Sequence, residues 1–271
     1  LFKALNTRLP LSVRVNTLKS SVDEVITKLR EEGKNPVIGK YVQTIVKFEG
    51  PYDFDKSELF KEGKIIIQEE AAAVASIILN PKPGDVVIDM CAAPGGKTTH
   101  LAELMRNKGE IYAFDIDRTR IKRMRQIIKR AGINIVKIYE MDVNKAPKVV
   151  GEEIADKVLL DAPCTASGTL MKNPELRWRI RPEGINEIVM EQYRLLKTAI
   201  RLAKPGGRIL YCTCSLFPEE NEELVKRIIN EHRELRIIPI KGPFSEGLIP
   251  GTMRAWPHKH ETIGFFYALL E

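Results

Sequence analysis

Apolar positions along most of the chain alternate between two spacings, and this alternation predicts an α/β protein. Short apolar runs typical of buried strands are followed by stretches with apolar residues every three to four positions, as on one helix face. Strands and helices that alternate in this way form a largely parallel sheet. From residue 85 onward we expect strands at 86–90, 110–115, 135–140, 157–161, 208–213 and 263–269, and helices at 97–105, 118–131, 184–202 and 218–231.

The first part of the chain predicts a smaller α/β unit. Residues 12–18 alternate like a strand, and Ser21 can cap a helix over 22–32. The elements expected next are strands at 43–48 and 64–68 and an alanine-rich helix at 69–79. We therefore place a domain boundary near Gln68, which divides the chain into residues 1–68 and 69–271. Residues 235–240 are expected to lie antiparallel to the last strand.

Length and composition are typical of a globular protein. The 271 residues are 44% hydrophobic and 29% charged, which suits one substantial core with a smaller appended unit. No apolar run approaches the roughly 18 to 20 residues of a membrane span, and the first ten residues lack the regions of a signal peptide. The four cysteines have no disulfide-framework spacing, so we expect a reducing, cytoplasmic location.

The net charge of +7 does not distinguish a nucleic-acid-binding protein from an ordinary basic enzyme. The distribution of charge along the chain is more informative. One basic cluster occupies the expected helix at 118–131 and is compatible with a solvated helix face. A second cluster lies near Cys164 and Trp178, and its composition favours contacts to phosphates and bases. Its members are Lys172, Arg177, Arg179 and Arg181.

A glycine-containing loop after the first strand of the sheet is the clearest ligand-binding motif. It reads Asp89-Met90-Cys91-Ala92-Ala93-Pro94-Gly95-Gly96-Lys97-Thr98 and leads into a helix, which lets the backbone approach a nucleotide closely. The spacing matches neither the dinucleotide-binding pattern nor the Walker phosphate loop. Pro94 removes an N–H that a pyrophosphate would use, and Asp89 would repel phosphate.

Acidic residues at the next strand ends strengthen this interpretation. Asp115 ends the second strand, where an acidic residue of a dinucleotide-binding fold holds ribose hydroxyls, and Asp142 follows the third strand. The loop and these carboxylates favour a cationic nucleoside without phosphate. S-adenosylmethionine has that chemistry, and we expect it as the cofactor.

Two cysteines follow two later strands. Cys164 follows Asp161-Ala162-Pro163, and Cys214 lies in Thr213-Cys214-Ser215. Because the carboxyl ends of strands converge on the ligand crevice, both thiols and Asp161 should face the cofactor. This combination indicates covalent chemistry on an electrophilic ring, although the pattern does not choose the attacking thiol. A zinc site of Cys91, Cys164, Cys212 and Cys214 is the alternative; it lacks paired C-x-x-C spacing and leaves the glycine loop unexplained.

Several motifs in a fixed order make the chain resemble the Sun/Fmu family of RNA cytosine carbon-5 methyltransferases over nearly its whole length. Besides the glycine loop and the two cysteine motifs, they are Arg14-Val15-Asn16-Thr17, Lys172-Asn173-Pro174, Arg177-Trp178, Pro218-Glu219-Glu220-Asn221-Glu222 and His260-Glu261-Thr262-Ile263-Gly264-Phe265-Phe266. The resemblance implies a Rossmann-like, S-adenosylmethionine-dependent methyltransferase fold. It also implies a small N-terminal α/β domain of the RNA-recognition-motif type.

The resemblance further implies residue roles. Cys214 would be the nucleophile, and Cys164 would assist breakdown of the adduct. For such a reaction, Asp161, if protonated or sharing a proton, can hydrogen-bond ring N3, and Lys97 can act on a thiol or the ring oxygen or merely stabilise the loop. The implied cofactor contacts are Cys91, Ala92, Ala93, Pro94, Gly95, Gly96, Lys97, Asp115, Arg120, Asp142 and Asp161.

The implied partner is RNA, with tRNA favoured over rRNA, and we expect a monomer that binds no metal. The implied RNA contacts are Lys172, Asn173, Arg177 and Trp178, of which the tryptophan either stacks on a base or packs in the core. Cys212 is interpreted as a small buried residue, and His258 and His260 as loop residues. DNA cytosine methylation is disfavoured by the Thr-Cys-Ser motif and the lack of a target-recognition domain. A catalytically silent RNA-binding or assembly factor would tolerate loss of the thiols, and this chain keeps both.

Overall fold

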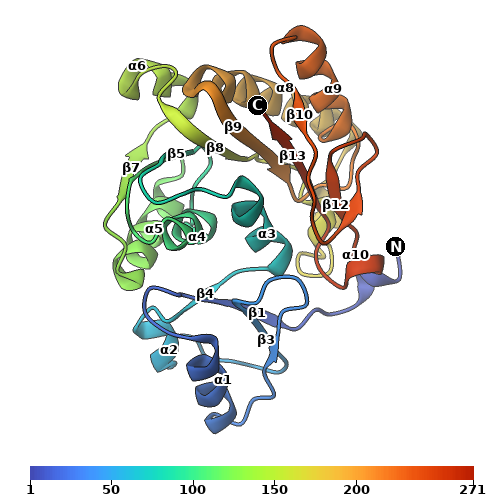
Figure 1. Cartoon of the computed structure of the whole chain (residues 1–271). Helices are drawn as coiled ribbons and strands as arrows, with labels where there is room; N and C mark the ends of the chain where they lie inside the picture. Colours follow the sequence, from blue (N-terminus) through green and yellow to red (C-terminus); the bar gives the residue numbers. More distant parts are fainter.

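Two β-sheets organise the chain, and the computed structural model describes residues 1–271 (Figure 1). The smaller sheet has the order β2-β3-β1-β4 and is antiparallel throughout. Its strands are β1 (Leu11–Val15), β2 (Val37–Ile38), β3 (Ile45–Phe48) and β4 (Ile65–Ile67), connected by α1 (Val22–Glu31) and α2 (Glu58–Lys61). This β-α-β-β-α-β order is the ferredoxin-like arrangement.

The larger sheet contains the parallel strands that the alternating pattern predicts. Its order is β11-β12-β13-β9-β8-β5-β6-β7, and β10 also pairs with β13. The parallel strands are β5 (Val86–Asp89), β6 (Glu110–Asp115), β7 (Val136–Glu140), β8 (Ala155–Asp161) and β9 (Ala203–Thr213). The antiparallel strands are β10 (Ile237–Ile238), β11 (Ser245–Glu246), β12 (Met253–Ala255) and β13 (Phe265–Leu270). The strand order reverses between β5 and β8, as in Rossmann-like folds.

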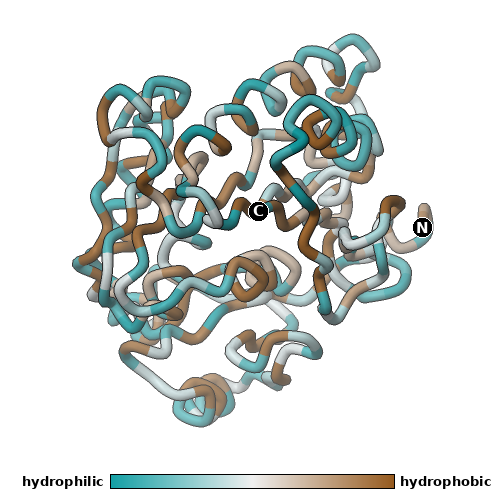
Figure 2. The backbone as a smooth tube through the Cα atoms, turned by 45° about the horizontal axis from the view of Figure 1, so that its top comes forward, coloured by the Kyte–Doolittle hydropathy of each residue, from teal (hydrophilic) through white to brown (hydrophobic).

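Helices cover both faces of the larger sheet and form two hydrophobic cores with it. One core includes α3 (Glu70–Leu79), α4 (Gly96–Leu104) and α5 (Arg118–Ala131), and the other includes α6 (Ala146–Val150), α8 (Pro182–Leu202) and α9 (Glu222–Glu231). Hydrophobic and hydrophilic segments alternate along the outer helices in Figure 2, as expected for amphipathic helices. The shorter helices are α7 (Leu176–Arg179) and α10 (Pro257–His260), with 3-10 turns η1 (Ala4–Asn6), η2 (Val143–Lys145) and η3 (Ser167–Thr169). None of the helices is both long enough and apolar enough to span a membrane.

Two predicted elements differ from the structure because polar side chains redirect the backbone. The first strand ends at Val15 rather than at residue 18, since the Asn16 side chain donates to the Gly63 and Ala131 carbonyls and accepts from the Leu18 N–H. The helix expected at 218–231 begins at Glu222, because the preceding residues form a hydrogen-bonded turn. The predicted antiparallel segment at 235–240 is confirmed by the pairing of β10 with β13.

A buried arginine connects the smaller sheet to the larger domain. Arg14 on β1 is fully buried, and its guanidinium donates to both carboxylate oxygens of Glu103 on α4, at 3.0 and 2.7 Å. It also donates to Thr99 Oγ1 at 2.9 Å and to the Gly96 carbonyl at 2.8 Å. These contacts cross between the parts that the sequence assigned to residues 1–68 and 69–271. The boundary near residue 68 itself stays a prediction.

Replacement of Glu103 by alanine should strongly destabilise the fold, because it leaves the Arg14 guanidinium buried without its charged partner. The expected loss in the free energy of unfolding is about 3–5 kcal/mol. The measurement is guanidinium-induced unfolding followed by circular dichroism. Glu152→Ala is the matched control, since its ion pair with Arg201 at 2.6 Å is about half exposed and should contribute about 1 kcal/mol or less. Equal losses for the two variants would contradict the structural role of Arg14.

Candidate active site

A cavity of about 360 Å³ lies at the switch point of the larger sheet, beyond the carboxyl ends of β5, β6 and β8. Its walls include seven of the predicted site residues, namely Cys91, Asp115, Arg120, Asp142, Asp161, Cys164 and Cys214. An adjoining cavity of about 280 Å³ shares four of these and adds Ala92, Ala93, Pro94, Gly96 and Lys97. The structure therefore gathers the predicted catalytic and cofactor residues around one hollow, and Gly95 alone among them lines neither cavity.

Three carboxylates at or just after strand ends make the two adjoining cavities acidic. Asp89 is buried at the end of β5, where burial raises the pKa of its carboxyl from 3.8 to about 7, although Thr98 Oγ1 donates to Oδ2 at 2.7 Å. The other oxygen, Oδ1, is buried without a hydrogen-bond partner. Asp115 and Asp142 lie at the ends of the next two strands and line the cavity. An unpartnered carboxylate oxygen in an acidic hollow favours a ligand that donates hydrogen bonds and carries positive charge.

Asp115 organises the glycine loop. Its Oδ2 accepts from the Ala93 N–H at 3.0 Å, and its Oδ1 accepts from the Asp117 N–H at 2.9 Å. Arg120, near the start of α5, donates to the Ala93 carbonyl, and its guanidinium lies 3.8 Å from the Asp115 carboxylate. A carboxylate has about four acceptor sites, so Asp115 retains capacity to accept hydroxyl groups of a ligand.

Asp161 at the end of β8 contacts two side chains from neighbouring elements. Lys97 Nζ lies 2.6 Å from Oδ2, and the Cys212 thiol lies 3.6 Å from Oδ1. Burial disfavours the charged form of Lys97, but the attraction of Asp161 prevails and raises the pKa of the ammonium above its usual value. Lys97 Nζ also lies 5.2 Å from the centroid of the Phe265 ring. Cys212 is fully buried, as expected, and burial raises the pKa of its thiol.

The two motif cysteines are in contact. Their Sγ atoms are 3.3 Å apart, and neither forms a disulfide. The parallel register of β8 and β9 explains this contact. Asp161 is paired with Cys212, and the two segments that follow these residues run side by side to Cys164 and Cys214. The hydrogen bond with Cys214, together with burial, raises the pKa of the Cys164 thiol. No group of three or more His, Cys, Asp or Glu side chains is arranged to hold a metal ion.

Gly168 in η3 supports the Cys214 segment through a close backbone approach. Its N–H donates to the Cys214 carbonyl at 2.8 Å, and its own carbonyl accepts from the Gly264 N–H at 2.8 Å. A Cβ atom at position 168 would lie 2.5 Å from the Gly264 oxygen and 2.7 Å from the Cys214 oxygen. Three segments therefore meet here at a distance that excludes any side chain.

The predicted RNA contacts lie around α7, outside the two cavities. Trp178 is 76% exposed, so the alternative in which it packs in the core is wrong. Arg177 donates to the Leu5 carbonyl at 2.9 Å and to Asn6 Oδ1 at 2.8 Å in the N-terminal turn. Lys172 is paired with Glu69, and Asn173 donates to Thr169 Oγ1 at 3.0 Å. Trp178 thus presents a free aromatic face, whereas the three polar residues have partners within the chain.

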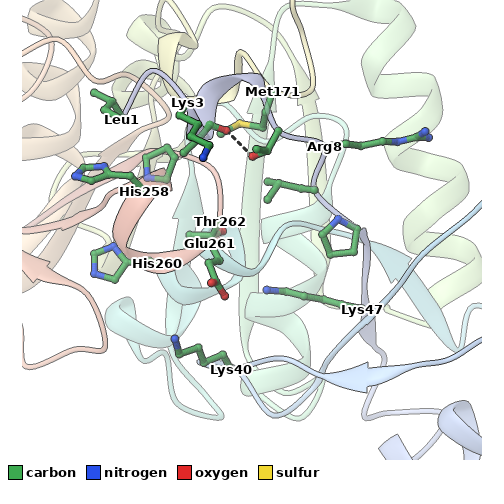
Figure 3. A pocket seen from close by; sticks show the side chains of 15 residues that line it. Leu1, Lys3, Arg8, Lys40, Lys47, Met171, His258, His260, Glu261 and Thr262 are labelled. Carbon is green, nitrogen blue, oxygen red and sulfur yellow. Dashed lines mark hydrogen bonds between the residues drawn. The ribbon is translucent and has the colours of Figure 1, made fainter.

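A larger cavity, about 570 Å³, contains none of the cysteines. It lies between the N-terminal segment, the smaller sheet and α10, and Figure 3 shows Lys3, Lys40 and Lys47 reaching toward it. His258 and His260 lie in α10 rather than in a loop, and His260 Nδ1 accepts from the Trp256 N–H at 2.8 Å. We assign the site to the smaller cavities, because the thiols and the acidic strand ends converge there.

Contributions to this site from α8, from the residue after β7 and from the turn before α9 were not predicted. Glu191 and Leu195 of α8 line the cavity, as does Met141 after β7. Glu220 binds the backbone and side chains beside both motif cysteines. The sequence analysis noted its motif, residues 218–222, but only the three-dimensional contacts show that Glu220 lies beside the two cysteine segments. Helical spacing alone could have indicated which face of α8 is buried, but not that this face reaches the cavity.

Comparisons with known proteins agree with this geometry. The family described as 16S rRNA methyltransferase RsmB/F matches residues 76–271, and the RsmF/B-like ferredoxin-like domain matches residues 1–55. A tRNA (cytosine(72)-C(5))-methyltransferase of Pyrococcus horikoshii is 41% identical over 231 residues, which cover 84% of this chain and 57% of the relative. The chain spans about 60% of the length of the curated relatives that it matches.

Solved structures of similar proteins match nearly the whole chain. The crystal structure of the protein PH0851 is 60% identical, with a TM-score of 0.98, over 100% of this chain and 61% of that chain. The crystal structure of NSun6 from Pyrococcus horikoshii with SFG is 30% identical, with a TM-score of 0.90, over 99% of this chain and 92% of that one. The predicted Rossmann-like methyltransferase fold and the predicted family are both confirmed. The chain therefore belongs to the RsmB/F (Sun/Fmu) family of RNA methyltransferases.

Proposed function

We propose that this protein methylates carbon 5 of cytosine in RNA, using S-adenosylmethionine and a covalent cysteine adduct, with tRNA preferred over rRNA. The observation that carries the proposal is the contact between the Cys164 and Cys214 thiols, 3.3 Å apart, beside the Lys97–Asp161 pair and the acidic cavity. The named activity of the Pyrococcus horikoshii relative supports cytosine carbon 5 and tRNA, whereas the matched family description names 16S rRNA.

The cavity residues fit S-adenosylmethionine. A volume of about 360 Å³ lies within the usual range for small-molecule sites. The unpartnered oxygen of Asp89 and the acidic lining suit a cation, and Asp115 keeps acceptor capacity for ribose hydroxyls. The relative solved with SFG, an S-adenosylmethionine analogue, supports the same cofactor. When bound, the cofactor supplies a methyl group activated by its sulfonium.

The two thiols take different roles in the proposal. The Cys214 thiolate adds to carbon 6 of the target cytosine, which makes carbon 5 nucleophilic. Once carbon 5 carries the methyl group, its proton passes to water, and the bond between carbon 6 and sulfur breaks so that Cys214 leaves as a thiolate. Cys164 assists this release. The contact between the two sulfur atoms allows both thiols to reach the same ring.

Lys97 and Asp161 act on the polar edge of the ring. The ammonium of Lys97 is held by Asp161 at 2.6 Å, and it donates to the ring oxygen. Asp161, which shares a proton with Lys97, hydrogen-bonds N3, and both contacts stabilise the negative charge that develops as sulfur adds. A preorganised pair of this kind requires little reorganisation during the reaction.

RNA binding in the proposal uses the surface around α7 and the first domain, residues 1–68. The exposed ring of Trp178 stacks on a base, and Lys172, Asn173 and Arg177 contact the strand after exchanging their present partners. The remaining residues, 69–271, form the catalytic domain.

The direct test measures 5-methylcytosine. Purified protein and S-adenosylmethionine are incubated with tRNA and 16S rRNA isolated from a strain that lacks the gene, and bisulfite sequencing locates the product. We expect a discrete methylated cytosine in tRNA. A site in rRNA alone would reverse the substrate preference, and methylation of DNA or of no cytosine would contradict the proposed function.

Asp115→Ala should weaken cofactor binding, because the variant loses the carboxylate assigned to the ribose hydroxyls. A lost hydrogen bond to a charged group corresponds to roughly 1–3 kcal/mol of binding free energy, measured by titration calorimetry. Asp117→Ala is the control, since Asp117 caps α5 in the same loop but does not line the cavity. Equal affinities of wild type and a folded Asp115→Ala protein would contradict the assignment.

The two cysteine variants should give opposite outcomes. Cys214→Ala should form no covalent RNA adduct and no 5-methylcytosine, while its cofactor affinity stays near that of the wild type. Cys164→Ala should form the bond and accept the methyl group but release RNA slowly, so that a conjugate survives denaturing electrophoresis. An adduct in Cys214→Ala and none in Cys164→Ala would exchange the two roles. Normal methylation by both variants would exclude the covalent mechanism.

A further inference from the structure

We infer that Glu220 is a positioning residue that holds the two cysteine segments of the proposed methyltransferase together. The chemical relevance of this role rests on the proposed function, whereas the contacts that support it do not depend on the substrate. Glu220 lies in the turn between β9 and α9, and it is completely buried. Burial of a carboxylate is costly unless donors compensate it, and the proposed mechanism does not use this residue.

One oxygen of Glu220 binds both cysteine segments. Thr165, the residue after Cys164, donates its Oγ1 to Oε1 at 2.5 Å. Ser215, the residue after Cys214, donates its hydroxyl to the same oxygen. A single atom thus bridges the segment that follows β8 and the segment that follows β9.

The second oxygen completes the arrangement. Oε2 accepts from the Thr165 N–H at 2.9 Å and from Gln192 Nε2 of α8 at 2.9 Å. Gln192 Nε2 also donates to the carbonyl of Pro163, the residue before Cys164, at 2.9 Å. All four acceptor sites of an ionised carboxylate are therefore occupied by donors. Cys164 is held on both sides, through Pro163 and Thr165.

The turn that carries Glu220 is itself fixed to the Cys214 segment. Asn221 Oδ1 accepts from Thr213 Oγ1 at 2.6 Å, and Asn221 Nδ2 donates to the Ser215 carbonyl at 3.0 Å. The Tyr211 hydroxyl donates to the Glu220 carbonyl at 2.6 Å. Cys214 is thus held on both sides as well. Charge-assisted hydrogen bonds are short and directional, so this carboxylate fixes the separation of the thiols more tightly than apolar packing would.

The primary test replaces Glu220 by glutamine and measures how readily the two thiols react with each other. In the glutamine variant an NH₂ group replaces one carboxylate oxygen and faces hydrogen-bond donors. The hydrogen bonds that this oxygen accepted are therefore lost. Diamide oxidises two thiols to a disulfide and is itself reduced to the hydrazine, and peptide mass spectrometry follows the Cys164–Cys214 bond without RNA or cofactor. Because disulfide formation requires a specific geometry, we expect the rate to fall by about tenfold or more. Glu219→Gln, an exposed neighbour in the same turn, should react at the wild-type rate.

A second pair of variants covers the case in which Glu220→Gln does not fold. Thr165→Val keeps the shape but loses the hydroxyl bound to Glu220, and Thr165→Ser retains it. Slower disulfide formation in the valine variant and near wild-type rates in the serine variant support the positioning role. Wild-type rates in folded Glu220→Gln, or in Thr165→Val if the first variant is unfolded, would overturn it.

Methylation kinetics separate this role from the proposed function. A small misplacement of the thiols should lower kcat by on the order of 100-fold while the affinity for S-adenosylmethionine stays unchanged, because Glu220 does not line the cofactor cavity. Equal loss of cofactor affinity and kcat would indicate general damage and overturn the inference. If the wild-type protein methylates no cytosine, the proposed function fails, and the disulfide rates still decide the role of Glu220.

Discussion

The parallel pairing of β8 with β9 is the constraint on which the site depends. Adjacent strands lie about 4.8 Å apart, and the register that pairs Asp161 with Cys212 carries both cysteine segments to the same edge of the sheet. A slip of one residue would turn every side chain of one strand to the opposite face. The other neighbour of β8 is β5, whose loop and helix bring Lys97 to Asp161. Strand order therefore assembles residues that no local motif contains together.

Periodicity and motif spacing predicted the parallel strands of the larger sheet, its strands β10 and β13, and the residues at its carboxyl edge. The short strands β11 and β12 were not predicted. Helix α5 has its predicted bounds, and in the structure Asp117 caps one end and Gly132 ends the other. The start of α9 was misplaced, since Pro218 is typical of a first helical turn but Glu220 and Asn221 bond to the β9 segment instead. A sequence pattern describes one element at a time, so it could place Cys164 and Cys214 at one edge but not in contact.

The smaller sheet contributes to the site through its attachment. Successive residues of β1 face opposite sides, so Val13 packs with the helices of the first domain while Arg14 enters the larger one. Ile66 of β4 belongs to the same core as α3 and α4. Arg14 bonds the Gly96 carbonyl at the start of α4. The first domain thus supports the helix that presents Lys97. This support connects the surface proposed to bind RNA with the Lys97–Asp161 ion pair beside the thiols.

The absence of a side chain at position 168 limits how this family can vary. Gly168 lies against the carbonyls of Cys214 and Gly264, so even alanine would displace the backbone of the segment that carries one of the thiols. Homologues with this backbone arrangement are therefore expected to keep glycine at this position while the neighbouring surface diverges. Both contacts are to backbone oxygen atoms, so the restriction holds whichever side chain stands at position 214.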